Sequence, residues 1–192
     1  MSALYDFLLI NESAVRLGCF ITVFLVMSLW ELVAPRRQLL YSKMTRWTNN
    51  LALVLMNSII LRLVFPVAAV GIAVFAENRG WGILNYLDIN QAVSVIVSII
   101  VMDAMIYLQH VMMHAVPVFW RLHRVHHADP DFDVTTGARF HPIEIILSML
   151  IKFAVIIVLG PPAVSVMILY VLLNVSAMFN HSNVRLKIYV VK

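Results

Sequence analysis

Long apolar runs dominate this chain and limit what it can fold into. A membrane-crossing helix needs about 20 mostly apolar residues, because about 30 Å of hydrocarbon is crossed at about 1.5 Å per residue. Three runs reach this length, and a fourth exceeds it but is split by Gly160-Pro161-Pro162; they cover residues 17–34, 51–76, 91–113 and 143–179. The sequence therefore predicts an all-α, polytopic membrane protein with three long transmembrane helices and a helical hairpin over 143–159 and 162–179.

Composition supports a single membrane domain over residues 1–192. Apolar residues make up 62% of the chain and charged residues 12%, whereas soluble domains average about 45–50% and 25%. The net charge is +4, but the basic residues lie in short segments between apolar runs, which is not a nucleic-acid-binding surface. The single cysteine, Cys19, lies inside the first run, and we interpret it as a packing residue.

The basic residues also predict an orientation. They follow the first run, the third run and the hairpin: Arg36, Arg37, Lys43 and Arg46; Arg121, Arg124 and Arg139; and Arg185, Lys187 and Lys192. The other side carries Arg16 and Arg79 beside four acidic residues, Asp6, Glu12, Glu77 and Asp88. The positive-inside rule therefore places the N-terminus outside and the basic segments in the cytoplasm. We also expect the second span to kink at Pro66.

Seven histidines carry the chemistry, and all of them lie after residue 109. His110 and His114 are separated by four residues at the end of the third run, so both project from one helix face. The other members of the group are His123, His126 and His127 in an HxxHH motif, His141 before the hairpin, and His181 after it. Because the hairpin returns to the side where it starts, all seven are expected at the cytoplasmic membrane face.

Seven imidazoles on one rim indicate a metal site. Imidazole suits zinc, copper, iron and nickel, and one cysteine excludes a thiolate-rich site. The HExxH signature of zinc proteases is absent, since no glutamate follows His110. A tetrahedral zinc uses four ligands, so a larger set favours a dinuclear site, and paired iron centres activate dioxygen. The alternative is a non-catalytic membrane protein that binds a metal or a haem, for which two histidines suffice.

Acidic residues near the histidines have two interpretations each. Asp103 lies inside the third run, on the same helical stripe as His110 and His114; it either orients a ligating imidazole or pairs with Arg62. Glu144 is either such a partner or a carboxylate at a helix start. Asp129, Asp131 and Asp133 alternate like part of a calcium-binding loop, but the glycine and distal glutamate of that motif are missing. We predict that these three aspartates lie in a solvated loop.

Four histidine motifs together resemble the fatty acid hydroxylase / sterol desaturase superfamily: His110-xxx-His114, Trp120-Arg-Leu-His123-Arg-Val-His126-His127, Arg139-Phe-His141-Pro and Asn180-His181-Ser-Asn183. The resemblance covers about residues 90 to 185. It implies an integral membrane di-iron enzyme of lipid biosynthesis that hydroxylates or desaturates a lipid or sterol, using dioxygen and an external electron donor. It further implies that His110, His114, His123, His126, His127 and His181 are iron ligands, with His141 a further candidate.

The chain departs from this family in one respect. The family carries a further HxxHH motif some tens of residues after the position of His181, whereas only eleven residues follow His181 here and none is histidine. We therefore expect either a truncated protein or a shortened paralogue. Loss of three ligands is expected to weaken or abolish the second metal position.

Overall fold

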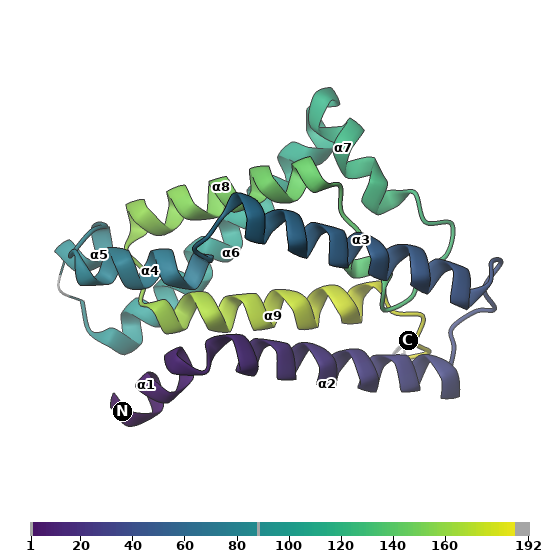
Figure 1. Ribbon diagram of the computed structural model, residues 1–192, viewed down its shortest axis with the longest axis horizontal. Helices are drawn as coiled ribbons and strands as arrows, with labels where there is room; N and C mark the ends of the chain where they lie inside the picture. The colour runs from purple at the N-terminus through teal and green to yellow at the C-terminus, as the bar shows by residue number, and fades with distance from the viewer. Residues whose placement is uncertain (1, 88, 187–192) are drawn as a thin grey trace, which may run out of the picture.

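The protein is a bundle of long helices, seen in a computed structural model that describes residues 2–87 and 89–186 (Figure 1). No β-strand forms within these residues; Pro35 and Val184 make an isolated bridge. The predicted all-α fold is confirmed. Asp88, Lys187 and Lys192, used above to predict the orientation, lie outside the described residues.

Nine α-helices and one short 3-10 turn are described. They are α1 (Ser2–Ile10), α2 (Glu12–Val33), α3 (Lys43–Val64), α4 (Ala69–Asn78), α5 (Ile83–Tyr86), α6 (Gln91–Ala115), α7 (Pro117–His127), the turn Thr136–Ala138, α8 (Pro142–Leu159) and α9 (Ala163–His181). Among these residues, five helical segments are long and apolar enough to cross a membrane, the α3–α5 region counting as one. The chain is therefore an integral membrane protein by length and composition.

Helices lie where the apolar runs predicted them, with two differences, both in the second run. The run over 51–76 forms two helices, because α3 ends at Val64 and α4 begins at Ala69. Pro66 lacks a backbone N–H and forces the preceding residue out of the helical conformation; Phe65 is extended at φ −121°. The expected kink is thus a complete break. In addition, α3 starts eight residues before the apolar run, with polar turns.

The hairpin turns at Gly160. This residue adopts the left-handed conformation at φ 67° and ends α8, and the two prolines that follow lead into α9. Gly82, ahead of α5, packs directly on this turn, since a Cβ atom built at Gly82 would lie 2.2 Å from the Gly160 backbone nitrogen. Only glycine fits at either position.

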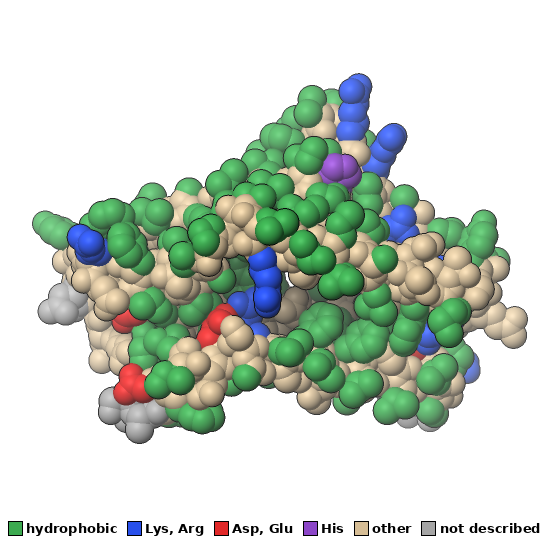
Figure 2. Space-filling model, viewed as in Figure 1, with side chains coloured by type: hydrophobic (Ala, Val, Ile, Leu, Met, Phe, Trp, Pro, Cys, Tyr) green, Lys and Arg blue, Asp and Glu red, His purple; other side chains and the backbone are tan. Residues whose placement is uncertain are grey.

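The segments that follow α2, α7 and α9 meet at one end of the bundle, and the N-terminus lies at the other end (Figure 1). Backbone hydrogen bonds join two of them, from Arg36 to Asn183 and from Arg185 to Ala34. The main buried core lies between α4, α6, α8 and α9. Apolar side chains also cover much of the outer surface (Figure 2), as expected for helices that face lipid.

Candidate metal centre

Four histidines from two helices converge at one point. His110 and His114 come from the end of α6, and His123 and His127 come from α7, which Pro117 starts directly after α6. One ring nitrogen of each lies within 4.8 Å of those of the other three. The Nε2 atom of His114 lies 3.2 Å from that of His110 and 3.2 Å from that of His127. We call these four residues the four-histidine group.

His126 and His181 form a second pair beside this group. Their Nε2 atoms are 3.0 Å apart. The Nδ1 atom of His126 donates to the Arg139 carbonyl, and that of His181 donates to the Ala177 carbonyl, at 3.2 and 2.8 Å. A carbonyl can only accept, so each neutral ring carries its proton on Nδ1. Both Nε2 lone pairs therefore face each other and cannot hydrogen-bond, which is the arrangement of two ligands for a cation.

Glu144 fixes the tautomer of His123 in the same way. Its Oε1 atom lies 2.6 Å from Nδ1 of His123, and both side chains are almost completely buried. A carboxylate in this position orients the ring, leaves Nε2 free to ligate, and makes the imidazole a stronger donor toward a metal. Of the two interpretations of Glu144, the contacts therefore favour the one in which it is the partner of a histidine.

Aromatic side chains pack against the histidine rings. Trp120 packs on His114 and His127, with ring centroids 5.3 and 5.6 Å apart, and Phe140 stacks on His126 at 4.7 Å. Burial, reinforced by the neighbouring His181, lowers the pKa of His126 to about 3. Burial and the nearby His123 also lower the pKa of His127. Both rings are therefore neutral at pH 7, which is the form that binds metals.

The donor set fits transition-metal ions. Two nitrogens bound at about 2.1 Å to one ion lie about 3.0–3.4 Å apart at ordinary coordination angles, and the contacting Nε2 atoms here are 3.0–3.2 Å apart. All six donors are imidazoles, which suit iron, zinc, copper and nickel. Cys19 lies on α2 and belongs to neither group.

Two candidates from the sequence make no hydrogen bond or ring contact with these histidines in the described part of the chain. The Nδ1 atom of His141 accepts a hydrogen bond from the Ile143 backbone at 3.1 Å, so His141 caps α8 and its proton sits on the other ring nitrogen. Asp103 lies on an exposed part of α6, and it makes no hydrogen bond or ion pair with Arg62, a histidine or any other described residue. The carboxylate that contacts a histidine is Glu144.

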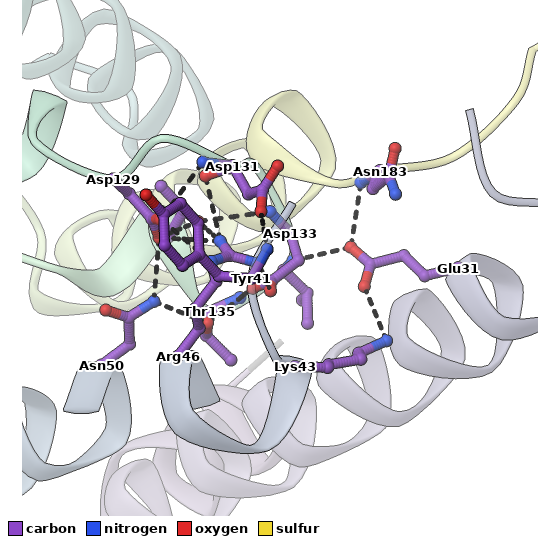
Figure 3. Close-up of polar contacts among 12 residues, drawn as sticks. Glu31, Tyr41, Lys43, Arg46, Asn50, Asp129, Asp131, Asp133, Thr135 and Asn183 are labelled. Carbon is purple, nitrogen blue, oxygen red and sulfur yellow. Dashed lines mark hydrogen bonds and ion pairs between the residues drawn. The ribbon is translucent and has the colours of Figure 1, made fainter. Parts of the chain in front are cut away.

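The predicted solvated loop is wrong. Asp129, Asp131 and Asp133 are all buried, and Arg46 of α3 lies among them (Figure 3). The Arg46 guanidinium binds both carboxylate oxygens of Asp129 at 2.9 and 2.7 Å, one oxygen of Asp133 at 2.5 Å, and the Asp131 carbonyl. The carboxylates of Asp129 and Asp133 are thus held by a buried cation, and the Asp131 carboxylate accepts from the backbone N–H groups of Leu40 and Tyr41. These contacts anchor the chain directly after the HxxHH motif to α3 and to the segment before it.

Glu31 is a site-supporting residue that sequence reasoning missed. Its Oε1 atom accepts from the backbone N–H groups of Val134 and Asn183, at 2.7 and 2.9 Å, and Lys43 binds its other oxygen (Figure 3). Val134 lies in the loop after α7, and Asn183 lies two residues after His181. One buried carboxylate therefore ties together the two segments that carry His126 and His181. The available signal was a glutamate near the end of an apolar run.

Comparison with known proteins gives one match. The family model described as fatty acid hydroxylase matches residues 95–192, which include all seven histidines. No curated protein and no solved structure matches the chain. The match spans half of the sequence and contains both histidine groups. The chain therefore belongs to the fatty acid hydroxylase family.

Proposed function

We propose that this protein is a membrane-bound non-haem di-iron oxygenase that hydroxylates or desaturates a lipid or sterol with dioxygen. The observation that carries the proposal is the convergence of imidazole Nε2 atoms in two adjacent groups, with the Nε2 atoms of His123, His126 and His181 left free of protons. Membership of the fatty acid hydroxylase family supports iron as the metal and a lipid as the substrate.

In this proposal the four-histidine group holds one iron ion, and His126 and His181 supply ligands to a second. Bound iron would supply dioxygen activation and the removal of hydrogen from an unactivated C–H bond. Hydroxylation places one oxygen atom in the product and releases the other as water, which requires two electrons from an external donor. Exposure of His110, His114 and His127 leaves one side of the group open to dioxygen and substrate.

The protein residues have positioning tasks in this reaction. Glu144 and the carbonyls of Arg139 and Ala177 hold protons on the Nδ1 atoms, so each ring presents a lone pair to the metal. Phe140 covers the buried ring of His126, and Trp120 packs against the exposed rings of His114 and His127 and so restricts their orientation. The site lies at the basic end of the bundle, which the positive-inside rule assigns to the cytoplasm.

Anaerobic reconstitution tests the proposal. The full chain, purified in detergent, is loaded with ferrous iron and mixed with a membrane lipid extract, a chemical reductant and ¹⁸O-labelled dioxygen. Hydroxylation predicts one labelled oxygen atom in a lipid product, and desaturation predicts loss of two hydrogens, both read by mass spectrometry.

His114→Ala is the matched loss-of-metal variant, and Arg79→Gln at the far end of the bundle is the control. The proposal requires product with wild type and Arg79→Gln and none with His114→Ala. Iron that fails to bind the wild-type chain, or product formation that is unaffected by His114→Ala, would contradict it.

A further inference from the structure

Two partly buried basic side chains lie among apolar helices that are remote from each other in sequence. The guanidinium of Arg16, from α2, lies 4.9 Å from the centroid of the Tyr170 ring, and the ammonium of Lys152, from α8, lies 5.3 Å from it. Tyr170 itself belongs to α9. Three helices that are long and apolar enough to cross the membrane thus bring two cations to one aromatic ring.

The charges at this point do not balance. Arg16 pairs with Glu12, one turn earlier in α2, but its Nε atom is buried and has no hydrogen-bond acceptor. Within the described part of the chain, Lys152 makes no hydrogen bond or ion pair. One carboxylate therefore faces two cations. A cation–π contact recovers only part of the cost of placing a charged group in hydrocarbon, and such residues mark functional sites by default.

A shallow, mostly apolar groove leads away from Arg16 over the surface between α2 and α9. It is too tight to admit a water molecule, and its lining includes Phe20, Val23, Asn174, Val175 and Met178. Both helices run in the same direction, toward the histidine end (Figure 1), and the groove extends about 10 Å along them at the rise of an α-helix. Figure 2 shows basic and acidic side chains together in a hollow on a largely apolar face.

We propose that Arg16 and Lys152 bind the anionic headgroup of a long-chain amphiphile, whose alkyl chain lies over the outside of the shallow groove between α2 and α9 and points toward the histidines. A carboxylate fits best, because it offers acceptors for the free Nε–H of Arg16 and for the Lys152 ammonium together. The assignment of this amphiphile as the substrate rests on the function proposed above. The binding site itself does not depend on the metal.

The distance from this site to the metal centre sets the length of the chain. Tyr170 precedes His181 by eleven residues on α9, which corresponds to about 16 Å along the helix. An alkyl chain must be long to span this distance. An acid of only a few carbons could pair with Arg16 and Lys152, but its chain would not reach the histidines. The same headgroup chemistry is found in fatty acids and in phospholipids, which the experiment must separate.

Equilibrium binding to the full chain in nanodiscs of zwitterionic lipid tests the proposal. Palmitate is compared with hexadecanol, which has the same tail without the charge, and with lysophosphatidate, which carries a phosphate. We expect palmitate to bind at least tenfold more tightly than hexadecanol. Lysophosphatidate binding more tightly than palmitate would identify a phospholipid as the source of the headgroup, and weaker binding would identify a fatty acid.

Variants then locate the site. Lys152→Met and Arg16→Gln should each weaken palmitate binding at least tenfold, and Lys152→Arg should restore it. Arg79→Gln is the matched control, because Arg79 also lies over an aromatic ring, that of Phe75, but outside the groove; it should bind palmitate as wild type does. Equal binding of palmitate and hexadecanol to the wild type, which needs no variant, or full binding by Lys152→Met, would overturn the assignment.

Metal content is measured on the same samples. Retention of metal by Lys152→Met with loss of palmitate binding supports the headgroup site and leaves the oxygenase proposal to its own test. Absence of palmitate binding from a wild-type protein that holds its metal refutes the headgroup site alone.

Discussion

The Nδ1 atom of His123 lies 2.6 Å from Oε1 of Glu144, and the two residues come from different helices, α7 and α8. His123 is completely buried, so its ring cannot turn to water. This contact fixes which nitrogen of His123 faces the four-histidine group. It also joins the start of the hairpin to the HxxHH motif.

Glu144→Gln removes the negative charge but keeps an oxygen that can accept from His123. We expect metal affinity to fall about 10- to 100-fold, as for other partners of ligating histidines. Competition with a chelator measures the change. Asp103→Asn is the comparison, since Asp103 makes no hydrogen bond or ion pair with any described residue, and it should leave the affinity unchanged. A larger loss of metal affinity in Asp103→Asn than in Glu144→Gln would mean that Asp103, which shares a helical stripe with His110 and His114, orients the ligating imidazole instead.

Glu31→Ala leaves the backbone N–H groups of Val134 and Asn183 without their acceptor. Each buried donor without a partner costs about 1–3 kcal/mol, so the melting temperature in detergent should fall and metal should be lost from the His126–His181 pair. Glu77→Ala is the control, because Glu77 accepts from Tyr5 and Ala163 at the opposite end of the bundle. Metal loss to the same extent in both variants would show that Glu31 acts through general stability only.

Arg46→Met tests whether the loop that carries Asp129, Asp131 and Asp133 depends on Arg46 for its stability. Without Arg46, the buried carboxylates of Asp129 and Asp133 lose their charge partner, and breaking a buried pair costs about 3–5 kcal/mol. Thermal unfolding followed by tryptophan fluorescence measures the loss. Lys43→Met, which removes a partly exposed partner of Glu31, should cost only about 0–1 kcal/mol. Similar small losses in both variants would mean that the loop is solvated after all.

Gly137→Ala tests the packing behind His181. A Cβ atom at Gly137 would lie 2.7 Å from the Ala177 carbonyl oxygen and 3.3 Å from Nδ1 of His181. The last turn of α9 must shift, which separates His181 from His126, so metal should be lost from that pair while the four-histidine group keeps its own. Gly18→Ala, where nothing lies within 4 Å, should retain all metal. Unchanged metal content in Gly137→Ala would show that His181 is not a ligand.

Apolar runs predicted the long helices because lipid-facing helices need little beyond length and hydrophobicity. They could not predict the first two turns of α3, where polar residues such as Arg46 and Asn50 face the buried aspartate loop rather than lipid. Spacing predicted that His110 and His114 share a face, since this depends on one helix alone. The partners of the rings could not be read in the same way: Glu144, Glu31 and the Ala177 carbonyl reach the site only through tertiary packing.

The solvated-loop prediction for Asp129, Asp131 and Asp133 was wrong for a related reason. Charged residues in a connecting segment are usually exposed, and nothing near them in sequence shows that Arg46, more than 80 residues earlier, will bury and neutralise them. For His141 the structure adds a local role, because its Nδ1 atom caps α8. Its assignment as a metal ligand stays a prediction.

Iron content and X-ray absorption of the anaerobically purified 192-residue chain test the central claim most directly. We expect iron with imidazole nitrogen ligands, partial loss of metal in His114→Ala and in His126→Ala, which address different groups, and full retention in His141→Asn, where asparagine can replace the helix cap. No bound metal in the wild type, or a metal content that neither His114→Ala nor His126→Ala reduces, would contradict a histidine metal centre in this protein.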